Sequence, residues 1–186
     1  MIRYLRGTVD LVLTLECDKP HVVKWWVDGS FAVHNDMRSH TGVTMSMGKG
    51  SVYSNSTRQK LNTRSSTEAE LVGVDDAMPQ ILWTQRFLED QGYGAGSSQI
   101  LQDNMSSILL EKNGRRSCGR RTRHLDIRYF FVTDRVKSRD VTIGHCPTDE
   151  MRRDFFTKPL QGAAFRKHRA TIMNCAEDYG LASKDD

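Results

Sequence analysis

The sequence lacks any uninterrupted apolar run of the roughly 20 residues that a membrane-spanning helix needs. Charged residues break up its N-terminal apolar patch, and no small-residue cleavage site follows, so we expect no secretory signal peptide. These absences argue against a membrane protein and a secreted one, and they favour an intracellular location. The interrupting residues are Arg3, Arg6, Asp10 and Glu16.

Cysteine is scarce, and none of the four cysteines forms a CxxC pair. In a chain of 186 residues this pattern favours free thiols in a reducing compartment over a disulfide framework. A zinc site drawn from Cys118, His124, His145 and Cys146 matches no structural zinc spacing, so we expect none. Patterns for a covalent nucleophile are missing too, since no Ser/His/Asp or Cys/His arrangement stands out.

Positive charge is present but unevenly distributed. The net charge is only +4, yet residues 115–123 contain five arginines in nine positions. A second basic run occupies residues 166–169. Such clusters suit a polyanionic partner, although a solvated loop and a solvated helix face would produce them equally well.

Hydrophobic periodicity predicts three strands followed by a long helix. Residues 22–28, 42–48 and 52–58 are rich in β-branched or alternating apolar residues and form a predicted meander. Helical spacing begins at Thr67. Pro79 lies inside this helix and is expected to kink or split it.

The remaining chain alternates predicted strands and helices. The complete order, β-β-β-α-β-α-α-β-α, predicts an α/β domain with one mixed sheet flanked by helices. The later strands are expected at residues 99–102 and Val141–His145, and the later helices at residues 105–110, 124–136, 149–158 (ended by Pro159) and 163–173.

Four carboxylates occur at predicted element boundaries, where the sites of α/β sheets gather. Asp28 ends the first strand, Glu70 lies in the first turn of the long helix, Asp103 follows a short strand and Asp154 lies in a late helix. Converging carboxylates repel one another unless cations neutralise them. Hard oxygen ligands of this kind select Mg²⁺ or Mn²⁺.

The motifs around these carboxylates resemble a known family. The strings VDGS, SSTEAEL, QDN, TRHLDIRYFFV and DFFTKPL occur in the order found in the ribonuclease H domain of copia-type retrotransposon polyproteins. The resemblance covers residues 21–160, and the string YLRGT at residues 4–8 resembles the end of the upstream reverse transcriptase or connection region. We therefore expect a remnant of that region at residues 1–20, a ribonuclease H domain at 21–160, and a helical extension with an acidic tail at 161–186.

The resemblance implies a ribonuclease H-like fold with a five-stranded mixed sheet. It also implies an endoribonuclease that hydrolyses the RNA strand of RNA–DNA hybrids, with two Mg²⁺ (or Mn²⁺) ions held by Asp28, Glu70, Asp103 and Asp154. One ion would lower the pKa of the attacking water and the other would stabilise the departing 3′ oxygen, about 4 Å away. The products would carry 5′-phosphate and 3′-hydroxyl ends. A reverse transcriptase region would accompany the domain inside retroelement particles.

The glutamate of the predicted site is ambiguous, because Glu68 and Glu70 both lie in the motif. We choose Glu70, since the family ligand is followed by a large apolar residue and then small or apolar ones, as at residues 71–74. The alternative is that Thr67 and Glu70 only form a capping box at the start of the helix.

Other residues are candidate contacts to substrate. His145 lies nine residues before Asp154, close to where cellular ribonucleases H place a mobile histidine that assists product release; it could equally just end a strand. Neighbours of the ligands are candidates for contacts to the 2′-hydroxyls of RNA, and cations are candidates for the DNA backbone. The 2′-hydroxyl candidates are Ser30 and Asn104, the backbone candidates are Arg58, Lys60, Arg121, Thr122 and Arg123, and His124 could bind phosphate or pack structurally. Trp25 and Trp26 are expected to pack in the core.

One departure from the family keeps alternatives open. Relatives have small or apolar residues before the last aspartate, whereas this chain has Arg152 and Arg153, which could pair with Asp154 and weaken metal binding. A catalytically weak or inactive hybrid-binding module is therefore one alternative. An integrase or transposase is another, but those enzymes place the glutamate last among three acidic residues, and here it comes second.

Overall fold

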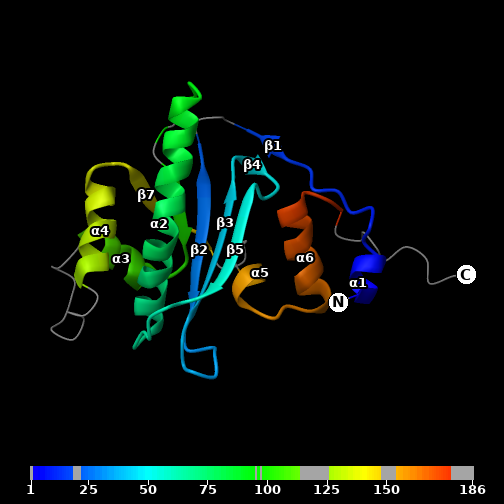
Figure 1. Ribbon diagram of the computed structural model, residues 1–186, viewed down its shortest axis with the longest axis horizontal. Coiled ribbons are helices and arrows are strands. Elements are labelled where there is room, and N and C mark those ends of the chain that lie inside the picture. Colours follow the sequence, from blue (N-terminus) through cyan, green and yellow to red (C-terminus); the bar gives the residue numbers. More distant parts are fainter. Residues whose placement is uncertain are drawn as a thin grey trace, which may run out of the picture.

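A five-stranded mixed sheet forms the centre of the computed structural model, with helices on both faces (Figure 1). The structure describes residues 2–18, 22–94, 96, 98–113, 126–147 and 154–176, without the side chains of residues 126, 127, 129 and 154. The strands are β1 (Glu16–Cys17), β2 (Lys24–Ser30), β3 (His40–Ser46), β4 (Gly48–Lys49), β5 (Tyr53–Arg58), β6 (Ser98–Gln102) and β7 (Val141–His145). The helices are α1 (Ile2–Arg6), α2 (Ser66–Asp90), α3 (Met105–Asn113), α4 (Asp126–Lys137), α5 (Asp154–Thr157) and α6 (Gly162–Met173).

The strand order is β5-β3-β2-β6-β7. The first three strands form the antiparallel meander expected from the sequence, while β6 and β7 run parallel to β2. The register pairs Trp26 with Leu101, and Gln102 with His145. This mixed sheet confirms the predicted fold class, and the parallel arrangement brings the carboxyl ends of β2, β6 and β7 to one edge of the molecule.

The core lies between the sheet and the helices α2, α3 and α4, which share one face in Figure 1, while α5 and α6 lie on the opposite side. Strand β2 is buried at five consecutive positions because both of its faces are covered. Trp25 packs into the main core and Trp26 into a smaller cluster with Cys146. The prediction that both tryptophans pack in the core is confirmed.

Helix α2 corrects one expectation. We expected Pro79 to kink or split this helix, and the split is wrong, because α2 continues from Ser66 to Asp90 through the proline. Pro79 is exposed, whereas Met78 and Ile81 beside it are fully buried. Apolar packing on both sides of the proline therefore offsets the loss of one backbone hydrogen bond, which typically costs about 3 kcal/mol inside a helix.

Other boundaries differ by small amounts. Strand β3 begins two residues before the expected position 42, and β7 has the expected bounds. Helix α5 starts at Asp154 in the structure, whereas the sequence predicted a helix from residue 149; residues 148–153 lie outside the described part. The ribbon formed by β1 and β4 was not predicted, since two-residue strands carry no periodic signal.

The β1–β4 ribbon joins the N-terminal segment to α6. Thr14 N donates to Met173 O at 3.0 Å, and Ser51 N donates to Ile172 O at 2.8 Å. The rings of Tyr4 and Phe165 also meet edge to face, 5.6 Å apart. These contacts connect the predicted segments 1–20 and 161–186 to each other and to the sheet.

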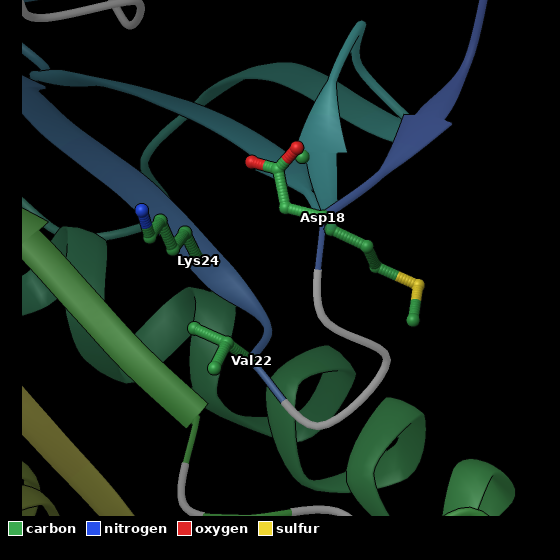
Figure 2. A pocket seen from close by; sticks show the side chains of 5 residues that line it. Asp18, Val22 and Lys24 are labelled. Atoms are coloured by element: carbon green, nitrogen blue, oxygen red, sulfur yellow. The ribbon is translucent and has the colours of Figure 1, made fainter.

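A cavity of about 260 Å³ lies beside this ribbon (Figure 2). Asp18, Val22, Lys24, Met47 and Gly48 line it. Lys24 begins β2, so the cavity is at the opposite end of that strand from Asp28. None of the predicted site residues that the structure describes lines it.

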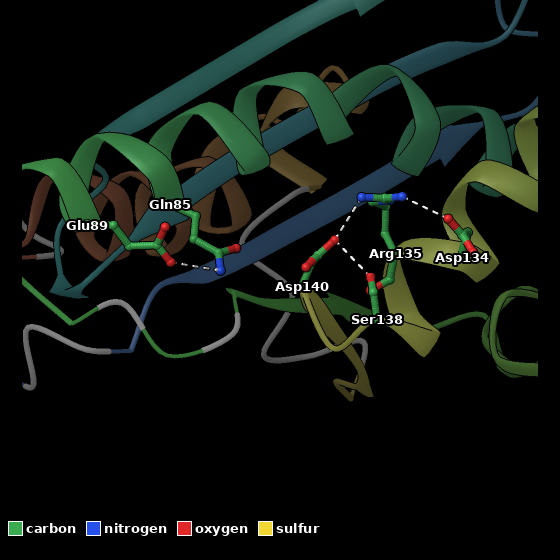
Figure 3. A network of polar contacts seen from close by, with 6 residues as sticks. All are labelled: Gln85, Glu89, Asp134, Arg135, Ser138 and Asp140. Atoms are coloured by element: carbon green, nitrogen blue, oxygen red, sulfur yellow. Dashed lines mark hydrogen bonds and ion pairs between the residues drawn. The ribbon is translucent and has the colours of Figure 1, made fainter.

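A polar network shapes the turn from α4 to β7 (Figure 3). Arg135 binds Asp134 at 2.8 Å and Asp140 at 2.9 Å, and Ser138 donates to Asp140 at 2.8 Å. Arg139 in this turn has a positive φ of 65°. Arg135 and Asp140 are half-buried, and both groups lie at the turn that leads into β7.

Within the described part of the chain, we find no helix with both the length and the apolar character required to cross a bilayer.

Candidate active site

Asp28 lies near the carboxyl end of β2 and is 5% exposed. The next residue, Gly29, touches the first turn of α2, because a Cβ atom there would lie only 2.6 Å from Glu70 N and would also overlap the Ala69 carbonyl. Only a residue without a side chain permits this approach. The string VDGS therefore does more than supply a carboxylate, since its glycine brings the start of α2 against the strand that carries Asp28.

Glu68 and Glu70 have different surroundings at the start of α2. Ser65 is the N-cap, and its hydroxyl accepts from Glu68 N at 3.2 Å. The Glu68 carboxylate accepts from Arg64 N at 2.7 Å. The cap is thus made by Ser65 and Glu68, and the alternative of a Thr67–Glu70 capping box is wrong.

Glu70 instead faces the end of β6. It is 5% exposed, and Gln102 Nε2 donates to Glu70 Oε2 at 3.5 Å. Gln102 is the last residue of β6 and directly precedes Asp103. Trp26 pairs with Leu101 in the parallel register, so Asp28 in β2 and Asp103, just beyond the end of β6, each follow two residues after this pair. Three of the four predicted carboxylates therefore come from elements that meet at one edge of the sheet.

Helix α5 packs against the same region. Thr157 Oγ1 donates a hydrogen bond to Asp28 Oδ2. Gly42, the register partner of Asp28, leaves room for this helix, since a Cβ there would lie 2.6 Å from Thr157 Cγ2. Ser56 Oγ donates to Phe156 O at 2.7 Å. Asp154 is the first residue of α5, so these contacts determine where its backbone enters the region.

Two of the remaining candidates lie beside the carboxylates. Asn104 follows Asp103 and its side chain accepts from Ser107 N at 3.2 Å, so it caps the start of α3. His145 is exposed at the end of β7, next to Gln102 in the register.

The other candidates are more scattered. Ser30 ends β2, Lys60 is exposed, and Arg58 pairs with Asp36 at 3.1 Å. Some predicted residues lie outside the described part of the chain: Arg121, Thr122, Arg123, His124, Arg152 and Arg153.

The sequence analysis missed His40, which lies opposite Ser30 in the sheet. Its ring contacts His34 Nε2 at 3.0 Å and Ser56 Oγ at 2.8 Å. Burial, followed by the neighbouring His34, lowers the pKa of His40, so its ring tends to be neutral. A lone histidine at the start of a strand belongs to no motif, so the sequence could not have indicated these contacts of His40.

The donor chemistry of the region fits a hard divalent cation. Buried carboxylates cost free energy unless opposite charge or hydrogen bonds compensate them, and carboxylate oxygens are the ligands that Mg²⁺ uses. Among the side chains that the structure describes, no three His, Cys, Asp or Glu residues are close enough to form a metal site, and Asp28, Glu70 and Asp103 are among those described. The Asp154 side chain lies outside the described part, and the two-ion arrangement stays a prediction.

Comparisons with known proteins bear on the family and on the fold. The chain is 30% identical over 159 residues to the retrovirus-related Pol polyprotein from transposon TNT 1-94 of Nicotiana tabacum, a match that covers 85% of this chain and 12% of that polyprotein. The chain thus spans about one eighth of the length of this relative. No protein-family model matches the chain.

Among solved structures, the chain resembles LC11-RNase H1, isolated from compost by a metagenomic approach. The TM-score is 0.55 at 15% identity, over 72% of this chain and 91% of that one. The same enzyme in complex with an RNA/DNA hybrid gives a TM-score of 0.50 at 15% identity, over 72% and 92% of the two chains. The protein is therefore a homologue of one segment of plant retrotransposon Pol polyproteins, and it has the fold of a ribonuclease H domain.

Proposed function

We propose that this chain is a metal-dependent endoribonuclease that hydrolyses the RNA strand of RNA–DNA hybrids and leaves 5′-phosphate and 3′-hydroxyl ends. The observation that carries the proposal is the meeting of β2, α2, β6 and α5 around Asp28. Gly29 allows α2 to approach the sheet, and Gly42 allows α5 to approach it. The hybrid-bound structure of LC11-RNase H1, which shares the fold, supports the choice of substrate.

In this proposal Asp28, Glu70, Asp103 and Asp154 hold two Mg²⁺ (or Mn²⁺) ions. When bound, such ions activate a water molecule and stabilise the leaving oxygen of a phosphodiester. The chain itself supplies the fixed carboxylates. Thr157 holds one oxygen of Asp28, and Gln102 holds one oxygen of Glu70, so that both side chains are oriented before substrate arrives.

Substrate contacts are assigned to the surrounding residues. His145 is exposed at the end of β7, and we assign it to assisting product release. Asn104 uses its carbonyl oxygen to cap α3, which leaves its amide N–H groups for a 2′-hydroxyl. Arg58 and Lys60 are exposed cations suited to the DNA backbone. In a parent polyprotein, a reverse transcriptase region would supply the hybrid inside retroelement particles.

The test is a cleavage assay with a labelled RNA–DNA hybrid, with Mg²⁺, with Mn²⁺ and without either ion. Wild type should cleave only the RNA strand and only with metal, and Asp103→Asn should not cleave. Asp90→Asn is the matched control, because Asp90 is an exposed carboxylate at the far end of α2. Tight hybrid binding without cleavage in either metal would overturn the proposal in favour of an inactive binding module.

A further inference from the structure

A buried carboxyl group that is not one of the proposed ligands lies close behind the site. Glu111 in α3 is 0% exposed. Ser107 Oγ donates to Glu111 Oε1 at 3.0 Å. The Gln102 side chain is a further hydrogen-bonding neighbour of this carboxyl group. A carboxyl group removed from water in this way needs a structural or functional reason, because its burial is costly.

The hydrogen bonds of Gln102 and Glu111 do not balance if Glu111 is a carboxylate. Gln102 is also 0% exposed; its amide nitrogen carries two N–H groups, and while it donates to Glu70 at 3.5 Å it also hydrogen-bonds to Glu111. Gln102 Oε1 and Glu111 Oε2 are both buried oxygens without a hydrogen-bond donor among the described residues. Two neighbouring acceptors cannot satisfy each other, and an unsatisfied buried polar group typically costs about 1–3 kcal/mol.

A single proton resolves this imbalance. A protonated Glu111 has an O–H group that can donate to Gln102 Oε1, which would satisfy both oxygens. Burial raises the pKa of Glu111 to about 8, although hydrogen bonds from Ser107 and Gln102 and the nearby Lys112 oppose this effect. At neutral pH the uncharged acid is therefore the main form.

We propose that Glu111, as an uncharged carboxylic acid, is a positioning residue for the metal site: it fixes the Gln102 amide, and Gln102 in turn fixes the Glu70 carboxylate. The proposal rests on the ribonuclease H function proposed above. It assigns a role to a residue that touches neither substrate nor metal and that carries no recognised motif.

The charge state of Glu111 decides which way the Gln102 amide points. An O–H donor at Glu111 holds Gln102 Oε1, while the two N–H groups of the same amide serve Glu70 and Glu111. A carboxylate at Glu111 would repel Gln102 Oε1 and drive the amide to turn its oxygen towards Glu70, where two oxygens also repel. The neutral acid thus keeps Glu70 in one orientation.

The test compares Glu111→Leu with Glu111→Gln. Leucine removes the donor to Gln102, whereas glutamine is uncharged, nearly isosteric and keeps an N–H donor. Mn²⁺ binding is measured by calorimetry without nucleic acid, and kcat and KM are measured with the hybrid at several Mg²⁺ concentrations. We expect Glu111→Leu to weaken Mn²⁺ binding and lower kcat about 10–100-fold, the range typical of residues that orient metal ligands, with KM for the hybrid unchanged. Glu111→Gln should restore both to near the wild-type values.

Gln102→Leu shows whether Glu111 acts through Gln102. In the Gln102→Leu background, the further change Glu111→Leu should have no additional effect on Mn²⁺ binding or kcat. Thermal unfolding separates this role from a structural one, because a variant that is folded at the assay temperature loses activity only through the site. Glu111→Leu leaves buried groups of Gln102 and Ser107 without a partner, so it should be less stable than wild type by about 1–3 kcal/mol and still fold.

Three results would overturn the inference: wild-type Mn²⁺ binding by folded Glu111→Leu, equal defects in Glu111→Leu and Glu111→Gln, or additive effects in the double variant. These results differ from failure of the proposed function. In that case wild type itself would neither bind Mn²⁺ nor cleave the hybrid.

Discussion

Glu68 and Glu70 are two residues apart in one motif, yet the structure gives them separate environments. Glu68 turns back towards Arg64 N and completes the cap of α2. Glu70 reaches forward to Gln102 at the end of β6. The offset of two residues on a helix changes the direction of a side chain by about 200°, so only one of the two can face the site.

This separation predicts opposite outcomes for two isosteric substitutions. Glu70→Gln should reduce metal-dependent cleavage more than about 100-fold, because loss of a ligand exceeds the 10–100-fold cost typical of groups that only orient ligands. Glu68→Gln should keep cleavage and lose at most about 1 kcal/mol of stability, because glutamine also serves in a capping box. Cleavage kinetics and urea unfolding of both variants check this. Loss of cleavage in Glu68→Gln with normal kinetics in Glu70→Gln would reverse the assignment.

At the scale of single elements, the stability of helix α5 depends on its tertiary contacts. It has only four residues, which is too short for a helix to be stable without tertiary packing. Gly42, Ser56 and Asp28 of the sheet supply that packing. The position of Asp154 at the start of α5 is thus set by residues far away in the sequence.

Removing one of these contacts should therefore affect the site and not only the helix. Thr157→Val keeps the side-chain volume but removes the hydroxyl that donates to Asp28. We expect about a 10-fold or greater fall in kcat and a higher Mg²⁺ requirement. Thr157→Ser keeps the hydroxyl and should stay close to wild type, which is the matched control. Equal Mg²⁺ dependence in Thr157→Val, Thr157→Ser and wild type would exclude a role for this hydrogen bond.

The sequence was sufficient for the elements with strong periodicity. It predicted the bounds of β7, the meander and a single mixed sheet, whereas the metal-binding role of the motif carboxylates stays a prediction. It could not predict partners that come from distant parts of the chain. Thr157 and Asp28 are 129 residues apart, and nothing local to either residue indicates the hydrogen bond between them. The continuity of α2 through Pro79 was missed for a similar reason, since packing by the whole sheet outweighs a local preference.

At the scale of the whole molecule, Glu111 links stability to pH. The raised pKa means that the folded chain keeps a proton that the unfolded chain releases. Between the ordinary value of 4.5 and about 8, the folded state binds more protons, so its stability falls as pH rises through this window. Below 4.5 both states are protonated and this contribution is fully present.

Glu111→Gln removes this titration. We expect its free energy of unfolding to fall less than that of wild type between about pH 5 and about pH 8, as measured by urea unfolding at a series of pH values. Comparison of the two proteins cancels the contributions of other groups, including His40. Parallel pH profiles for wild type and Glu111→Gln would show that Glu111 has an ordinary pKa.

The contacts between the N-terminal segment and α6 have a mechanical consequence. Thr14 N binds Met173 O, and Asn174 Nδ2 donates to Glu16 Oε1 at 3.0 Å, so the two ends of the described chain are fastened to each other. Tension applied between these ends acts first on these hydrogen bonds, which break one at a time. The central strands bear load only after these hydrogen bonds have broken. Neighbouring parts of a longer polyprotein could therefore pull on this domain without disturbing the geometry around Asp28.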